Sequence, residues 1–252
     1  MEKKKSRIIL ALDFPHSENH KQLLSSSLRV LDSVAPYICA VKMNRQLVLP
    51  LGLFDGVQKI VNHAHELGLL TIMDAKINDI GSTNRAIAEY YFDAGFDAVI
   101  ASSFVGWDEG LQSVFEVAKK MNRGVIVLVY MSHKGAIEGY GQMVQRSETK
   151  RLVPQYRIFA EKALKWNADG AVVGATYPSK IRDVRAILKD IVPIYSPGVG
   201  AQGGDVEASL KAGATYLIVG RIIVEAENPA MAAEQVRHDA WLSGKEKLAK
   251  SR

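Results

Sequence analysis

Two carboxylates and a lysine lie close together at residues 74–79, in the spacing Asp-x-Lys-x-x-Asp. Asp74 and Lys76 are two residues apart, so an extended backbone places both side chains on the same side. There the carboxylate keeps the lysine protonated and oriented, which favours a proton donor over a Schiff-base nucleophile. Asp79 falls just before a predicted helix. It either takes part in this chemistry or only stabilises the start of that helix.

A glycine-rich segment and an arginine have the composition of a phosphate site. The run Ser-Pro-Gly-Val-Gly-Ala-Gln-Gly-Gly-Asp at 196–205 precedes a predicted helix, and its bare backbone can approach an anion closely. Gly220 and Arg221 follow the next apolar run, and a guanidinium suits bidentate contact with phosphate. The glycines alone are a weak signal, but together with Gly-Arg they predict phosphate binding.

Short apolar runs alternate with amphipathic segments along the whole chain, and these elements must position the polar residues. The runs are apolar throughout, as parallel strands covered on both faces require. The predicted strands cover residues 8–12, 38–41, 69–73, 98–101, 125–129, 171–173, 194–196 and 216–219. The predicted helices cover residues 17–34, 54–65, 82–94, 109–120, 155–166, 178–188, 205–212 and 229–241. This pattern favours an α/β fold, a single (β/α)8 TIM barrel spanning residues 1–252 with a polar tail from about 241; a doubly wound open sheet is the alternative.

Polar residues end several of the predicted strands. Asp13, Lys42 and Asp74 end the first three, and Ser132 follows the fifth. In a TIM barrel the C-terminal strand ends form the active-site face, so these groups are expected to converge there. A single charged residue in such a place would be only a solvent-facing strand stop. The irregular stretch 132–154 is the longest in the sequence, which is typical of a functional or mobile loop.

Composition and charge limit the class of protein. The net charge of +5 is held largely by the two ends of the chain, and no basic stripe interleaved with aromatics predicts nucleic-acid binding. No apolar stretch reaches the roughly 18 residues of a membrane span. The single cysteine, Cys39, lies among apolar residues and is expected to be buried, which suits a reducing cytoplasm. The six histidines show no zinc-ligand spacing.

The segment 74–80 resembles the Asp-x-Lys-x-x-Asp-Ile signature of the orotidine 5′-phosphate decarboxylase family. Other segments also resemble the family and occur in the same order along the chain as in its members, and they are closest to the archaeal-type branch. These segments are 11–13, 41–42, 131–133, 196–204 and 219–221. The resemblance implies conversion of orotidine 5′-monophosphate to UMP and CO2 in de novo pyrimidine biosynthesis. It also implies a homodimer that uses neither a metal nor another cofactor.

The resemblance gives each matching residue a role. It implies that Lys76 protonates C6 of the pyrimidine as CO2 departs, and that Asp74 lies beside the substrate carboxylate. Lys42 would join this charged array, and with Asp13 it would hold the ribose hydroxyls. On the pyrimidine and phosphate side, the implied substrate-binding residues are Ser132, Pro197, Gln202, Gly220 and Arg221.

The remaining implied site residues belong to the neighbouring subunit's site. They are Asp79, which would contact the 2′-hydroxyl, together with Ile80 and Thr83. Two other functions stay open. Related enzymes that act on sugar phosphates with Mg²⁺ share Asp-x-Lys-x-x-Asp, and chelator sensitivity would separate them from the decarboxylase. A catalytically silent phosphosugar-binding barrel is the other alternative, although it predicts replacement of Asp74 or Lys76, and both are present.

Overall fold

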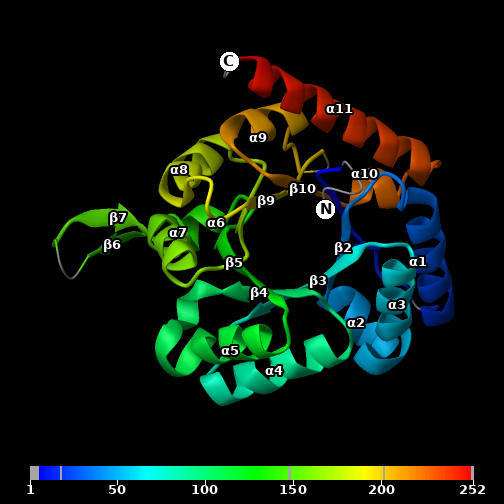
Figure 1. Ribbon diagram of the computed structural model, residues 1–252, viewed down its shortest axis with the longest axis horizontal. Coiled ribbons are helices and arrows are strands. Elements are labelled where there is room, and N and C mark those ends of the chain that lie inside the picture. Colours follow the sequence, from blue (N-terminus) through cyan, green and yellow to red (C-terminus); the bar gives the residue numbers. More distant parts are fainter. Residues whose placement is uncertain (1–5, 18, 147–148, 201, 251–252) are drawn as a thin grey trace.

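A closed ring of parallel strands forms the centre of the computed structural model, and helices surround it (Figure 1). The structure describes residues 6–17, 19–146, 149–200 and 202–250, with side chains up to residue 242. Residues 1–5 of the basic N-terminal segment, residues 251–252 of the predicted tail and Ala201 of the glycine-rich run lie outside the described residues. The barrel strands, in ring order, are β1 (Ile8–Ala11), β10 (Tyr216–Val219), β9 (Ile194–Pro197), β8 (Gly170–Val173), β5 (Gly124–Tyr130), β4 (Ala98–Ser102), β3 (Leu70–Ile77) and β2 (Ala40–Asn44).

Closure of the ring confirms the predicted TIM barrel and excludes the open sheet. The first strand, β1, pairs in parallel with β2 on one side and with the last strand, β10, on the other. Residues on both faces of the strands are buried, as the uniformly apolar runs predicted. Cys39 is also buried, as expected, and burial raises the pKa of its thiol to about 11.

Helices pack against the outside of the barrel (Figure 1). The helices are α1 (His20–Val34), α2 (Arg45–Leu51), α3 (Gln58–Glu66), α4 (Gly81–Asp93), α5 (Gln112–Lys120), α6 (Ala136–Gly139), α7 (Gln155–Lys165), α8 (Pro178–Leu188), α9 (Val206–Ala212), α10 (Arg221–Val224) and α11 (Pro229–Lys250). α11 therefore continues through most of the segment expected to be a polar tail. Within the described part of the chain, no helix has the length and apolar character needed to cross a membrane.

The connection between β2 and β3 differs from the sequence prediction. One helix was expected over 54–65, whereas the chain forms α2, a π-helical segment (Gly52–Val57) and then α3. Gly52 ends α2 with a positive φ of 72°, a conformation that glycine adopts without a steric penalty. The additional helix begins directly after Asn44, so it fixes the end of β2 beside the barrel mouth.

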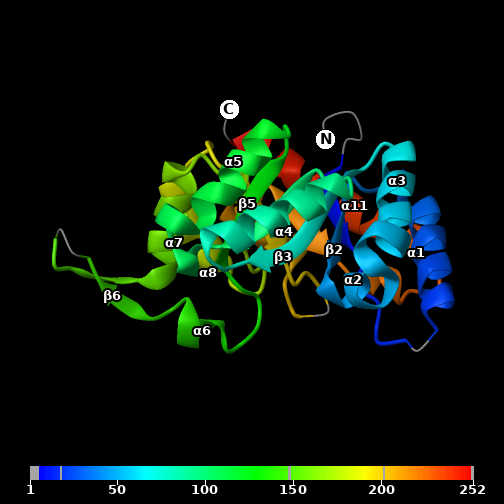
Figure 2. The same cartoon turned by 90° about the horizontal axis from the view of Figure 1, so that it is seen from below.

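The stretch 132–154 was expected to be irregular, and this prediction is wrong in part. It contains α6 and an antiparallel hairpin of β6 (Met143–Gln145) and β7 (Leu152–Pro154). Figures 1 and 2 show this hairpin projecting from the side of the barrel. Strands of three residues are too short to give a readable alternation in the sequence, which explains why they were missed.

Candidate active site

A cavity of about 940 Å³ opens at the C-terminal ends of the barrel strands. Side chains from β1, β2 and β3 and from the connections after β5, β9 and β10 line it. The predicted site residues among its lining are Asp13, Lys42, Asp74, Lys76, Ser132, Pro197, Gln202, Gly220 and Arg221. Residues far apart in the sequence thus meet at one end of the barrel, because all of its strands run in the same direction.

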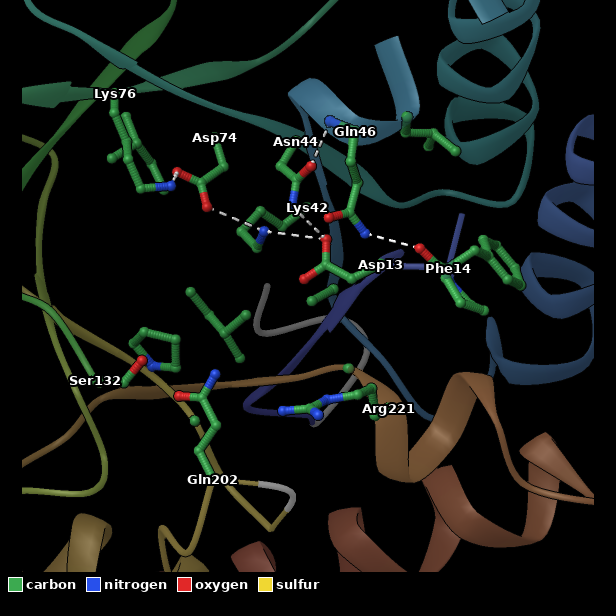
Figure 3. A pocket seen from close by; sticks show the side chains of 18 of the residues that line it. Asp13, Phe14, Lys42, Asn44, Gln46, Asp74, Lys76, Ser132, Gln202 and Arg221 are labelled. Atoms are coloured by element: carbon green, nitrogen blue, oxygen red, sulfur yellow. Dashed lines mark hydrogen bonds and ion pairs between the residues drawn. The ribbon is translucent and has the colours of Figure 1, made fainter. Parts of the chain in front are cut away.

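A chain of alternating charges crosses one side of this cavity (Figure 3). Lys76 Nζ donates to Asp74 Oδ1 at 2.7 Å, and Lys42 Nζ donates to the second oxygen of the same carboxylate at 3.1 Å. Lys42 Nζ also lies 3.6 Å from Asp13 Oδ1. One carboxylate is therefore shared by two lysines, and each lysine is held in a defined place by opposite charge.

Burial and charge act in opposite directions on this array, and charge prevails. The Lys42 side chain is only 5% exposed. Burial alone lowers the pKa of Lys42, but the carboxylates of Asp74 and Asp13 outweigh it and raise the pKa above its usual value. Burial alone raises the pKa of Asp74, but Lys42 and Lys76 lower it below its usual value. At neutral pH both Lys42 and Asp74 are therefore ionised.

The backbone that carries Lys76 is not a regular strand. In the pairing of β3 with β4, Met73 lies opposite Val99, whereas Ile77 lies opposite Ala101. The stretch of β3 from Met73 to Ile77 is therefore longer than the stretch of β4 that it faces, so β3 bulges at this point. Lys76 has a φ of +50°, which costs roughly 1–2 kcal/mol for a residue with a side chain. The predicted contact with Asp74 is present, but the extended backbone predicted at Lys76 is wrong. Such strain is typical of functional sites, where the surrounding structure maintains it.

The opposite side of the cavity has the features of a phosphate site. Figure 3 shows Gln202 and Arg221 across the cavity from Asp74 and Lys76. Arg221 is exposed and, among the described residues, has no ion-pair partner, so its guanidinium is available to an anion. Gly198 has a φ of +94°, and a Cβ there would lie 2.8 Å from Gln202 Oε1 and 3.0 Å from Ser132 Cβ. The positive φ favours glycine at this position, and a side chain there would also require Gln202 and Ser132 to shift.

The glycine-rich loop folds back on itself beside this site. Gly203 N donates to the carbonyl of Gly200, and Gly200 N donates to the carbonyl of Gly204, each at 2.7 Å. Gly204 N in turn donates to the carbonyl of Gly198 at 3.0 Å. The loop is therefore a compact turn whose ends are fastened together, which suits movement as one unit.

Asp79, Ile80 and Thr83 lie apart from this array. They sit at the N-terminal end of α4, and none of them lines the cavity. Asp79 Oδ1 accepts a hydrogen bond from the main-chain N–H of Ile80, and the buried Asn84 side chain holds both polar groups of the Asp79 main chain. Ile80 is 63% exposed. Within a single chain, these three residues do not take part in the site.

Asn44 is a cavity residue that the sequence analysis missed. It lies two residues after Lys42 at the end of β2, and its Nδ2 donates to Asp13 Oδ1 at 2.8 Å. The alternation that paired Asp74 with Lys76 places Lys42 and Asn44 on one side of β2 as well, so this signal was available. In the part of the chain that the structure describes, no three His, Cys, Asp or Glu side chains are grouped to hold a metal.

Comparison with known proteins settles the family. The family model for orotidine 5′-phosphate decarboxylase / HUMPS matches residues 6–236. The chain belongs to this family. An orotidine 5′-phosphate decarboxylase from Methanococcoides burtonii is 36% identical over 92% of this chain and 96% of its own.

Solved structures of the family share the fold. An orotidine 5′-monophosphate decarboxylase from Methanocaldococcus jannaschii, complexed with the inhibitor BMP, superposes with a TM-score of 0.78 at 30% identity. It covers 92% of this chain and 97% of its own. The enzyme from Pyrococcus horikoshii gives 0.74 at 35% identity, covering 92% and 98%. The resemblance to the archaeal-type branch of the orotidine 5′-phosphate decarboxylase family is therefore confirmed.

Proposed function

We propose that this chain decarboxylates orotidine 5′-monophosphate to UMP and CO2, a step of de novo pyrimidine biosynthesis. The observation that carries the proposal is the Lys42–Asp74–Lys76 array facing Gln202 and Arg221 across one cavity. A nucleotide has a reactive base at one end and a phosphate at the other. Its base would lie beside the charged array, and its phosphate would lie beside Gln202 and Arg221. A cytoplasmic location is part of the same proposal, supported by the single, buried Cys39.

The proposed reaction breaks the bond between C6 and the carboxylate carbon. The electron pair stays on C6, where no neighbouring group can delocalise it, so fixed charge must stabilise it. Lys76 supplies that charge and transfers its Nζ proton to C6, and the lysine later regains a proton from solvent. Asp74 holds Lys76 in place at 2.7 Å and repels the substrate carboxylate, which leaves as neutral CO2.

The proposed roles of the other cavity residues are those that the family resemblance implies, and their place in the cavity supports them. Asp13 and Lys42 hold the ribose hydroxyls, and Ser132 hydrogen-bonds the pyrimidine. The phosphate side is formed by Pro197, Gln202, Gly220 and Arg221. Binding energy from the phosphate, remote from the reacting carbon, then offsets the repulsion at the carboxylate.

The direct test is an assay of the purified protein with orotidine 5′-monophosphate, followed by the ultraviolet change on formation of UMP. We expect turnover that EDTA does not reduce. No turnover by the wild-type protein would contradict the proposal. A strict Mg²⁺ requirement with a sugar phosphate as substrate would instead favour a related enzyme of the same family.

Arg221→Ala should lower kcat/KM for orotidine 5′-monophosphate by about 10³-fold, because two charge-assisted hydrogen bonds to phosphate are lost. Steady-state kinetics with the nucleotide and with orotidine, which lacks the phosphate, separates this cause from a general defect. The variant and the wild type should process orotidine equally. Arg29→Ala is a suitable control, because Arg29 is exposed and, among the described residues, its side chain hydrogen-bonds to the Ser26 hydroxyl alone. Equal losses with both substrates would argue against a phosphate role.

We also propose that the active unit is a homodimer in which α4 serves the neighbouring subunit's site. Asp79, Ile80 and Thr83 are placed outside their own cavity but close to the end of β3 that carries Lys76. In this arrangement the partner's Asp79 completes the charged array and contacts the ribose 2′-hydroxyl. The Asn84 contacts hold the Asp79 main chain in position for that role.

Mixing two inactive variants, Asp79→Asn and Lys76→Ala, should restore activity if sites are shared. A hybrid dimer has one site with Lys76 from one chain and Asp79 from the other, and one site lacking both. Random exchange of chains should therefore recover about a quarter of the wild-type rate. Native mass spectrometry would show whether hybrids have formed. Hybrids without any recovered activity would exclude sharing.

A further inference from the structure

Asn44 is connected to the charged array through Asp13 and not through a lysine. Its Nδ2 donates to Asp13 Oδ1 at 2.8 Å, which is shorter than the 3.6 Å between Lys42 Nζ and the same oxygen (Figure 3). In the pairing of β2 with β3, the Asn44 backbone lies opposite Asp74. Asn44 thus stands between the end of β1 and the reactive part of the site.

The orientation of the Asn44 amide is fixed by the start of α2. Asn44 is the N-cap of this helix, and its Oδ1 accepts a hydrogen bond from Gln46 N at 2.8 Å. A main-chain N–H can only donate, so the carbonyl side of the amide must face it, and the NH₂ side must face Asp13. Asp13 therefore accepts a hydrogen bond from the Asn44 amide and cannot donate one to it.

The first turn of α2 also forms a hydrogen bond to Phe14, the residue after Asp13. Gln46 Nε2 donates to the carbonyl of Phe14 at 2.9 Å, so Asn44 and Gln46 together hold the consecutive residues 13 and 14. The buried Leu47, 1% exposed, anchors this first turn of α2 in the core. A carboxylate at the end of β1 would otherwise rotate freely about its side-chain bonds, at an entropic cost when it binds a ligand.

We propose that Asn44 is a positioning residue that orients the Asp13 carboxylate toward the substrate's ribose through its fixed NH₂ donor. The inference rests on the proposed function, since it assigns Asp13 to ribose binding. Because Asn44 acts through substrate binding and not through the reacting carbon, its loss raises KM more than it lowers kcat.

Asn44→Asp separates this role from helix capping. Aspartate caps a helix as well as asparagine does, so the melting temperature should stay close to that of the wild type. At about pH 8 the introduced carboxylate cannot donate to Asp13 and repels it, and KM should rise by about 10-fold to about 100-fold. Asn44→Ala should show a similar rise in KM and, in addition, a lower melting temperature.

Acidification should rescue Asn44→Asp and not Asn44→Ala. The new carboxyl faces Asp13, with Lys42 and Asp74 beyond it, and the adjacent like charge raises its pKa. Below that pKa it is protonated and can donate to Asp13 as the amide does. The ratio of variant to wild-type kcat/KM should therefore rise from about pH 8 to about pH 5. Taking the ratio removes pH effects that the variant and the wild type share, such as the titration of the substrate phosphate.

Asn228→Asp is the matched control, because Asn228 is exposed and accepts from Met231 N as a cap of α11. Its kinetics should equal those of the wild type at every pH. If Asn44→Asp has wild-type KM throughout, or a defect that does not change with pH, the positioning role is wrong. A wild-type protein that fails to turn over orotidine 5′-monophosphate would instead overturn the proposed function, and with it this inference.

Discussion

Lys76→Ala should lower kcat for orotidine 5′-monophosphate by at least about 10⁴-fold, the upper end of the range for loss of a general acid. The loss is expected to be large because the change removes both the proposed proton donor and the positive charge proposed to stabilise the developing carbanion. Lys42 cannot replace it, since its side chain is 5% exposed and already lies between two carboxylates. Single-turnover decarboxylation with enzyme in excess over substrate measures the effect directly, and in steady-state kinetics KM should change far less than kcat.

Lys59→Ala provides the control for the loss of a lysine. Lys59 Nζ pairs with Asp55 at 2.7 Å on the surface, and its side chain is 62% exposed. This variant should retain the wild-type kcat. Lys76→Arg should remain inactive, because a guanidinium keeps its proton at any accessible pH. A Lys76→Ala enzyme with kcat within about tenfold of the wild type would exclude Lys76 as the proton donor.

Asp74→Asn should destabilise the fold by about 3 kcal/mol at neutral pH, as well as abolishing most activity. The physical reason is the buried Lys42, for which Asp13, at 3.6 Å, would be the one remaining counter-charge among the described residues of the chain. Urea unfolding of both proteins measures the difference. Asp55→Asn, which breaks the exposed pair with Lys59, should change the free energy of unfolding by less than about 1 kcal/mol.

The stability difference caused by Asp74→Asn should depend on pH in a defined direction. Lys42 and Lys76 outweigh burial and hold the pKa of Asp74 below its usual value near 3.8. Asp74 therefore stabilises the fold above that value, and this contribution disappears as pH falls through the lowered pKa and the carboxylate is protonated. The difference in the free energy of unfolding between wild type and variant should be constant from about pH 5 to about pH 7 and should become smaller below about pH 4. A difference in the free energy of unfolding that stays constant down to about pH 2.5 would show that the lysines do not hold Asp74 ionised.

Local sequence patterns were sufficient for the elements and for much of the site. Uniformly apolar runs identified every barrel strand, because a strand covered on both faces leaves no polar alternation. Polar residues at the ends of those runs identified Asp13, Lys42 and Asp74, since the ends of parallel strands meet at one rim. The hairpin of β6 and β7 escaped detection because each strand has only three residues.

The sequence by itself determined the alternation of strands and helices, the Asp-x-Lys-x-x-Asp motif and the glycine-rich segment at 196–205. These features depend on residues close together in the chain, and their periodicity is visible without a structure. Only the tertiary structure decided that β1 and β10 close the ring and that Lys42 and Lys76 share the Asp74 carboxylate. It also decided that Asp79 does not line its own cavity and that Asn44 holds Asp13. Contacts of this kind join residues from different strands, and they depend on register, on the bulge at Lys76 and on side-chain direction, none of which a local pattern encodes.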